Sequence, residues 1–142
     1  MTPASVLVVE DDDSVRRLLV EYFREHSDLR VEGARDGVDA LHEVATRHID
    51  VVVLDLLMPY MSGVDFLVSL TTLAGDDTPG RLEHRPAVVI ITGAPQDEVP
   101  SDAIEKRFPD LVRCVHRKPL DVESLAACVG SHLENELSGH RE

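Results

Sequence analysis

The chain has 142 residues, 43% of them hydrophobic, which is typical of one globular domain with a single core. Its net charge of −13, from 14 basic and 27 acidic side chains, and its lack of a Lys/Arg-rich run argue against direct contact with nucleic acid. No apolar stretch reaches membrane-spanning length and the N-terminus lacks signal-peptide regions, so we expect a cytoplasmic protein that does not enter a membrane.

The first half of the chain alternates between short apolar runs and segments of helical periodicity. Residues 6–9 form a continuous apolar run, typical of a strand covered on both faces. The apolar stripe of a helix follows, made of Val15, Leu18, Leu19, Tyr22 and Phe23. A weaker strand at 29–33 precedes a second helix, for which Asp36 is the expected N-cap. The apolar face of that helix consists of Val38, Leu41, Val44 and Ala45.

The second half continues the alternation. Strands are expected at 51–54, 87–91 and 111–115. Helices are expected from near Ser62 to 70, at 101–108, and from Asp121 to about 136. Polar, turn-forming residues at 71–85 predict a long connection before the fourth strand. Pro95 and Pro100 delay the fourth helix to Ser101, which could act as its N-cap.

Five strand–helix alternations predict an α/β fold. Right-handed crossovers then give a flavodoxin-like, doubly wound sheet of five parallel strands in the order 2-1-3-4-5, with five helices. We interpret residues 1–142 as one domain with a core at about 5–136 and a flexible C-terminal tail at 137–142. Ligands of such folds bind beyond the carboxyl ends of the strands.

Reactive side chains follow four of the predicted strands. Glu10 and Asp11 come after the first strand, Asp55 after the third, Thr92 after the fourth and Lys118 after the fifth. Each alone is explained as well by a turn, a helix N-cap or a solvated side chain. Together, the strand order brings three carboxylates into one cleft, where their repulsion is relieved by a hard divalent cation and one lysine.

The sequences of these segments resemble the four signature blocks of response-regulator receiver domains. The blocks are VLVVEDD at 6–12, VLDLLMP at 53–59 with Gly63, ITG at 91–93 and KP at 118–119. The resemblance covers roughly residues 5–136 and implies a two-component phosphorelay. In that system Asp55 would receive a phosphoryl group from a sensor histidine kinase or a phosphotransfer protein, with no turnover of an external substrate.

The resemblance also implies a role for each site residue. Asp11, Asp55 and the backbone carbonyl of Leu57 would bind Mg²⁺, with Mn²⁺ as a substitute, and Glu10 would hold the metal or its water. Lys118 and Thr92 would contact the phosphoryl oxygens. The Lys118–Pro119 peptide bond is expected to be cis.

Three positions bear on switching and on the lifetime of the phosphorylated state. Val115 stands where the family usually has the Tyr or Phe of its rotamer switch. Leu57 and Ala94 occupy the two positions best placed to orient the hydrolytic water, and neither side chain can form a hydrogen bond, so we expect slow hydrolysis. The family's output face, made by the fourth helix, fifth strand and fifth helix, would bind a downstream protein or a second copy of the chain.

Two other functions remain open. A receiver-like interaction module that is never phosphorylated would fit Val115, although such modules typically lose a site residue and none is missing here. A phosphatase with an aspartate nucleophile would need a DxD loop, whereas Leu56 and Leu57 follow Asp55.

Cys114 and Cys128 are the only cysteines, and they lack CxxC spacing. We therefore expect two buried thiols in a reducing compartment. The seven histidines show no linear zinc-binding pattern.

Overall fold

The computed structural model describes residues 4–58, 60–75, 85–94 and 97–139. These residues contain one five-stranded sheet in the order β2-β1-β3-β4-β5, in which every neighbouring pair is parallel. The strands are β1 Ser5–Val9, β2 Arg30–Ala34, β3 Val51–Asp55, β4 Ala87–Thr92 and β5 Val112–Arg117. This topology confirms the predicted fold class.

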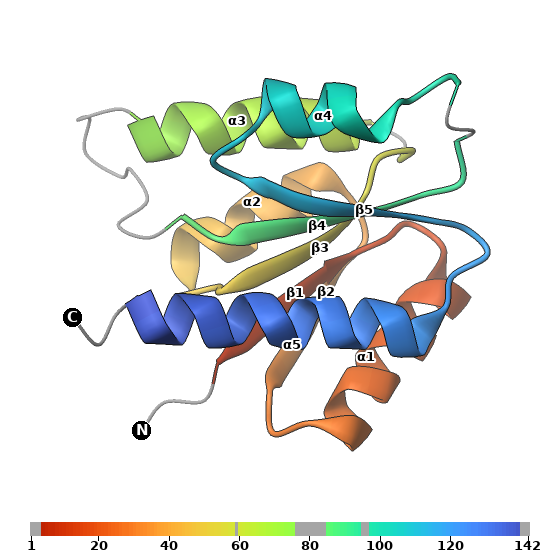
Figure 1. Ribbon diagram of the computed structural model, residues 1–142, viewed down its shortest axis with the longest axis vertical. Helices are drawn as coiled ribbons and strands as arrows, with labels where there is room; N and C mark the ends of the chain where they lie inside the picture. Colours follow the sequence, from red (N-terminus) through yellow and green to blue (C-terminus); the bar gives the residue numbers. More distant parts are fainter. Residues whose placement is uncertain (1–3, 59, 76–84, 95–96, 140–142) are drawn as a thin grey trace.

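Helices cover both faces of the sheet. They are α1 Asp13–His26, α2 Gly37–Thr46, α3 Gly63–Gly75, α4 Ser101–Arg107 and α5 Val122–Gly139. Helices α1 and α5 lie on one face, and α2, α3 and α4 lie on the other (Figure 1).

The three central strands, β1, β3 and β4, are buried on both sides because they are almost continuously apolar, whereas the edge strands β2 and β5 are only partly buried. Side chains of successive strand residues point to opposite faces. Val6 and Val8 therefore pack in the core beneath α1 and α5, while Leu7 and Val9 pack in the core beneath α2, α3 and α4. This arrangement fixes the strands rigidly and presents their carboxyl ends along one edge.

Two helical stripes were predicted too wide, by one residue in α1 and by two in α2, where Ala45 is exposed as well as Val38. Leu18 in α1 is 57% exposed and Val38 in α2 is 59% exposed, so neither belongs to the core. In α2 the smaller Ala40 is buried beside Val44 instead. The spacing matched a helical face, but the sheet beneath covers only part of that face.

The ends of several elements also differ from expectation. The prediction that Ser101 caps α4 is wrong, because Pro100 holds the N-cap position without a side-chain bond. Helix α3 extends to Gly75 and so includes the start of the predicted connection, and α5 extends to Gly139. Residues 76–84 of that connection, Pro59, Pro95 and the last three residues lie outside the described part of the chain.

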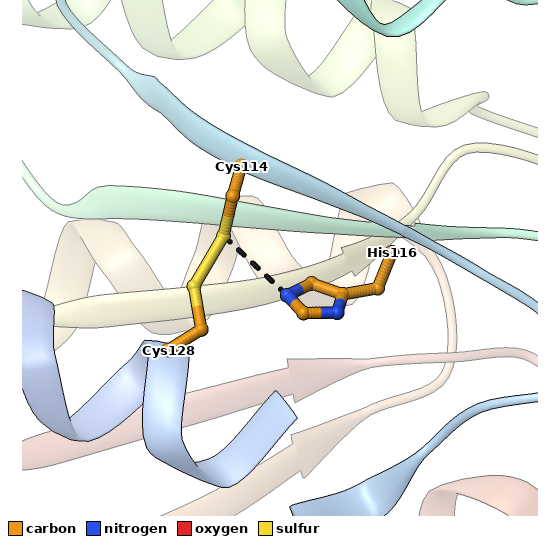
Figure 2. The surroundings of a disulfide bond; sticks show 3 residues. All are labelled: Cys114, His116 and Cys128. Atoms are coloured by element: carbon orange, nitrogen blue, oxygen red, sulfur yellow. Dashed lines mark hydrogen bonds between the residues drawn. A yellow bond between two sulfur atoms is a disulfide. The ribbon is translucent and has the colours of Figure 1, made fainter. Parts of the chain in front are cut away.

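The two cysteines are joined by a disulfide that links β5 to α5 (Figure 2). Both side chains are partly buried against the core beneath α1 and α5. The expectation of two free thiols is therefore wrong for this state of the protein. Across the described residues, no helix has the length and apolar character needed to cross a bilayer.

Candidate functional site

The predicted site residues meet at the carboxyl edge of the sheet. Glu10 directly follows β1, Asp55 ends β3, Thr92 ends β4 and Lys118 directly follows β5. Parallel pairing in register sets them side by side, since Val9 is opposite Leu54 and Asp55 is opposite Ile91. At the far edge, Thr92 is opposite Arg117, next to Lys118.

Three acidic side chains form the centre of the site. Glu10, Asp11 and Asp55 each offer a carboxylate oxygen, and these atoms lie within 4.8 Å of one another. Glu10 and Asp55 are buried while Asp11 is exposed, so the cluster opens to solvent on the side of Asp11. The prediction that these three residues converge is confirmed.

Lys118 bridges the two buried carboxylates. Its Nζ lies 2.7 Å from Glu10 Oε1 and 3.4 Å from Asp55 Oδ2. Burial lowers the pKa of Lys118, but the hydrogen bond to Glu10 and the charge of Asp55 outweigh this effect and raise it overall. The ammonium group therefore stays charged beside Asp55.

The pKa of Glu10 shows that the positive charge of Lys118 does not balance the negative charge of the three acids. Burial, reinforced by Asp55, raises the pKa of Glu10 from 4.5 to about 8, although Lys118 acts in the opposite direction. Glu10 Oε2 is buried and has no hydrogen-bond partner among the described residues. An orphaned carboxylate oxygen between two other acids is the donor set that a hard divalent cation takes, so these residues fit Mg²⁺.

Backbone groups orient the other side chains of the site. The Leu57 N–H donates to Asp55 Oδ1 at 3.1 Å, and the Ala94 N–H donates to Thr92 Oγ1 at 3.1 Å. The Lys118 N–H donates to the Thr92 carbonyl at 2.8 Å, which ties the end of β5 to β4. The Lys118–Pro119 bond is cis, as predicted.

The three residues singled out for switching and lifetime lie in different environments. Val115 packs against the core beneath α2, α3 and α4. Ala94 is buried at 5% exposure, whereas the Leu57 side chain is 56% exposed. Leu57 is thus the one of the three whose side chain faces solvent beside Asp55.

Arg117 is a residue beside the site that was not predicted from the sequence. Its guanidinium donates to the Ala94 carbonyl at 2.6 Å, to the Val99 carbonyl, and to Ser101 Oγ at 3.1 Å. These bonds hold the segment between β4 and α4 against the end of β5. No motif marks Arg117, because two of its partners are backbone carbonyls that are set by the path of the chain.

The match to known proteins agrees with this geometry. Residues 6–129 match the model of the response regulator receiver domain, and the chain belongs to that family. It is therefore a response regulator receiver domain, the kind of domain found in two-component systems. Members of the family generally bind Mg²⁺ at their acidic pocket, and they interact with histidine kinases and downstream effectors.

Individual relatives cover the receiver region. The chain is 36% identical over 98 residues to protein-glutamate methylesterase/protein-glutamine glutaminase 5 of Myxococcus xanthus (strain DK1622), covering 68% of this chain. It is 40% identical over 77 residues to response regulator MprA of Mycobacterium sp. (strain KMS), covering 54% of this chain. These matches span only 26% and 33% of the length of the two relatives.

The fold of the chain is also similar to that of a solved receiver domain. A signal receiver domain from Vibrio parahaemolyticus superimposes with a TM-score of 0.79 at 25% identity, over 99% of this chain and 98% of the other. The similarity thus extends along nearly the whole of both chains.

Proposed function

We propose that Asp55 accepts a phosphoryl group from the phosphohistidine of a histidine kinase or a phosphotransfer protein in a Mg²⁺-dependent reaction. One observation carries this proposal: Lys118 contacts both Glu10 and Asp55 within a cluster of three carboxylates. If Lys118 only formed a structural ion pair, neither the third acid, Asp11, nor the unpartnered Glu10 Oε2 would be needed. A phosphoryl group and a cation would use both.

Asp55 is the nucleophile. One of its carboxylate oxygens attacks the phosphorus, a new O–P bond forms, and the N–P bond of the donor breaks with its electron pair returning to the imidazole. The Leu57 N–H holds Asp55 Oδ1, and Lys118 approaches Oδ2, so the carboxylate is oriented before the donor arrives. Orientation of this kind supplies much of the acceleration in phosphoryl transfer.

Lys118 and Thr92 would stabilise the negative charge of the incoming phosphoryl group. The Lys118 ammonium would neutralise one phosphoryl oxygen as it moves from Glu10. Thr92 Oγ1 already accepts a hydrogen bond from the Ala94 N–H, so its hydroxyl proton is free to donate to another oxygen.

The carboxylates of Glu10, Asp11 and Asp55, with the Leu57 carbonyl, would hold Mg²⁺ or Mn²⁺. When bound, this ion supplies Lewis-acid neutralisation of the charge on the phosphoryl oxygens. Asp11 is exposed and thus gives the ion a route from solvent.

Phosphorylation would change the surface made by α4, β5 and α5, to which a partner would bind. Thr92 is linked to Ala94 directly, and Ala94 is linked to α4 through Arg117 and Ser101. A shift of the Thr92 hydroxyl toward a phosphoryl oxygen would therefore be transmitted to α4 and to a protein partner or a second copy bound there.

The test is intact-mass analysis after incubation with acetyl phosphate and Mg²⁺. We expect wild type and Asp13→Asn to gain one phosphoryl group and Asp55→Asn to gain none, because Asp13 is an exposed acid outside the cluster. An unchanged wild-type mass would instead support the interaction module that is never phosphorylated. Continuous release of phosphate from an external ester would support the phosphatase.

A further inference from the structure

A second group of side chains that could hold a metal ion, separate from the acidic cluster, lies between β5 and α5. Its three members are shown in Figure 2. Cys114 and His116 are two residues apart on β5, so both point toward α5, from which Cys128 reaches back. One ligand atom of each lies within 4.8 Å of the other two. The distance from Cys114 Sγ to His116 Nε2 is 3.5 Å.

We propose that Cys114, His116 and Cys128 form a binding site for a borderline-soft divalent cation such as Zn²⁺ when the disulfide is reduced. Two thiolates and one imidazole are ligands that Zn²⁺ prefers and that Mg²⁺ does not. Three protein ligands would leave one position of a tetrahedral ion for a solvent molecule. All three side chains are partly buried, so the ion would be shielded yet reachable.

The backbone spacing suits an ion between the sulfurs. Zinc–thiolate bonds of about 2.3 Å place two tetrahedral sulfur ligands roughly 3.8 Å apart. The Cα atoms of Cys114 and Cys128 are 7.8 Å apart, which lets side-chain rotation alone open that gap after reduction. Asp121, at the start of α5, interacts electrostatically with His116, and a carboxylate near a metal-binding histidine commonly supports such sites.

The metal-bound and disulfide forms exclude each other, because sulfurs bonded to one another are not thiolates. Oxidation by a low-molecular-weight disulfide balances by thiol exchange: two cysteine thiols give one protein disulfide, and the reagent gives two thiols. Both forms join β5 to α5, but only the reduced form holds an ion. The linear sequence did not reveal the site, since Cys128 lies on a different element from the other two ligands.

Titration of the full-length protein with Co²⁺ tests the proposal. The protein is reduced with a phosphine and kept in excess Mg²⁺, so that the acidic cluster is occupied by a hard ion. We expect a thiolate-to-cobalt charge-transfer band that saturates at one ion per chain and disappears when one equivalent of Zn²⁺ is added. Protein oxidised with glutathione disulfide should be lighter by two hydrogen atoms and give no band.

Substitution of each proposed ligand tests whether that side chain binds the ion. Cys114→Ser and Cys128→Ser should abolish the band, and His116→Gln should weaken Co²⁺ binding by about tenfold or more. His42→Gln on the exposed face of α2 is the matched control and should bind as wild type does. If a cysteine variant does not fold, the thiols of the reduced wild type are alkylated instead, and this treatment should likewise abolish the band. Absence of the band from reduced wild type, or equal affinity in His116→Gln and His42→Gln, would overturn the assignment.

Discussion

At the scale of single residues, Glu10 shows what gathering three carboxylates costs the fold. Its pKa is raised from 4.5 to about 8 by burial and by Asp55. Below pH 4.5 the carboxyl is protonated in both the folded and the unfolded chain. Between these values only the folded chain retains the proton, so stability is lost as the pH rises and the full cost remains above pH 8.

We therefore predict that Glu10→Gln stabilises the metal-free protein. At pH 8 the free energy of unfolding should rise by about 1–3 kcal/mol, and the gain should shrink to zero near pH 4.5. Urea unfolding in EDTA across this pH range measures it. A gain that is constant with pH, or a loss at pH 8, would contradict the raised pKa of Glu10.

Leu57 offers a test of the lifetime of the phosphorylated state. Its exposed side chain lies beside Asp55 and cannot orient a water molecule. Leu57→Asn should therefore speed the loss of phosphate severalfold in a single-turnover decay assay. Ala94→Glu would add a second polar group, but Ala94 is buried, so the charged side chain must displace the loop to reach the site.

Decay in Leu57→Asn that is as slow as in wild type would reject the role of Leu57. Leu57→Met is the matched control, because it keeps a long apolar side chain that forms no strong hydrogen bond, and it should leave the decay rate unchanged.

The acidic centre of the site was predictable at this scale because Glu10 directly follows one strongly apolar strand and Asp55 ends another. Glu10, Asp11 and Asp55 could be placed together from strand order, whereas the role of Lys118 was implied only by the resemblance to the family. Arg117 and the Cys114–Cys128 disulfide could not, because their partners depend on the path of a loop and on which face of α5 meets β5.

At the scale of elements, the segment between β4 and α4 is the part that Arg117 restrains. With Val115 in place of an aromatic residue, we predict that activation moves this segment without a ring rotation. Adding beryllofluoride and Mg²⁺ should shift the backbone amide resonances of residues 93–94, 97–99 and 101. Shifts confined to the segments after β1 and β3 would reject the prediction.

Arg117→Met tests the restraint itself. Loss of these hydrogen bonds should accelerate amide exchange at residues 97–99 and 101 about tenfold in the unphosphorylated protein. Arg113→Met, at an exposed position of the same strand, is the control and should leave exchange unchanged. Equal exchange in the two variants would show that Arg117 does not hold the segment.

The strands were easier to predict than the helices. A strand buried on both faces is apolar along almost its whole length, so its location can be predicted from composition alone, as at residues 51–54. A helix has one buried stripe whose width depends on its neighbours, which is why Leu18 and Val38 were misplaced. Helix ends depend on local competition for hydrogen bonds, and at α4 Arg117 takes the Ser101 hydroxyl.

At the scale of the whole molecule, the acidic site exists only when the sheet is complete. Lys118 and Glu10 are 108 residues apart in the sequence, and the unfolded chain has no means of holding the three carboxylates together. A cation that binds this cluster therefore binds the folded state alone. Such binding must stabilise the entire domain in proportion to the logarithm of the cation concentration.

We predict that Mg²⁺ raises the melting temperature of wild type. At a concentration about 100 times Kd the gain is about 2.7 kcal/mol, or roughly 5–10 °C for a domain of this size. Asp11→Ala should lose most of the rise, since it removes the exposed ligand, while Asp13→Asn should keep it. Calorimetric melts at stepped Mg²⁺ concentrations measure the effect. Equal rises in Asp11→Ala and wild type would place the cation elsewhere on this acidic protein, because ions screening its net charge of −13 would stabilise both variants alike.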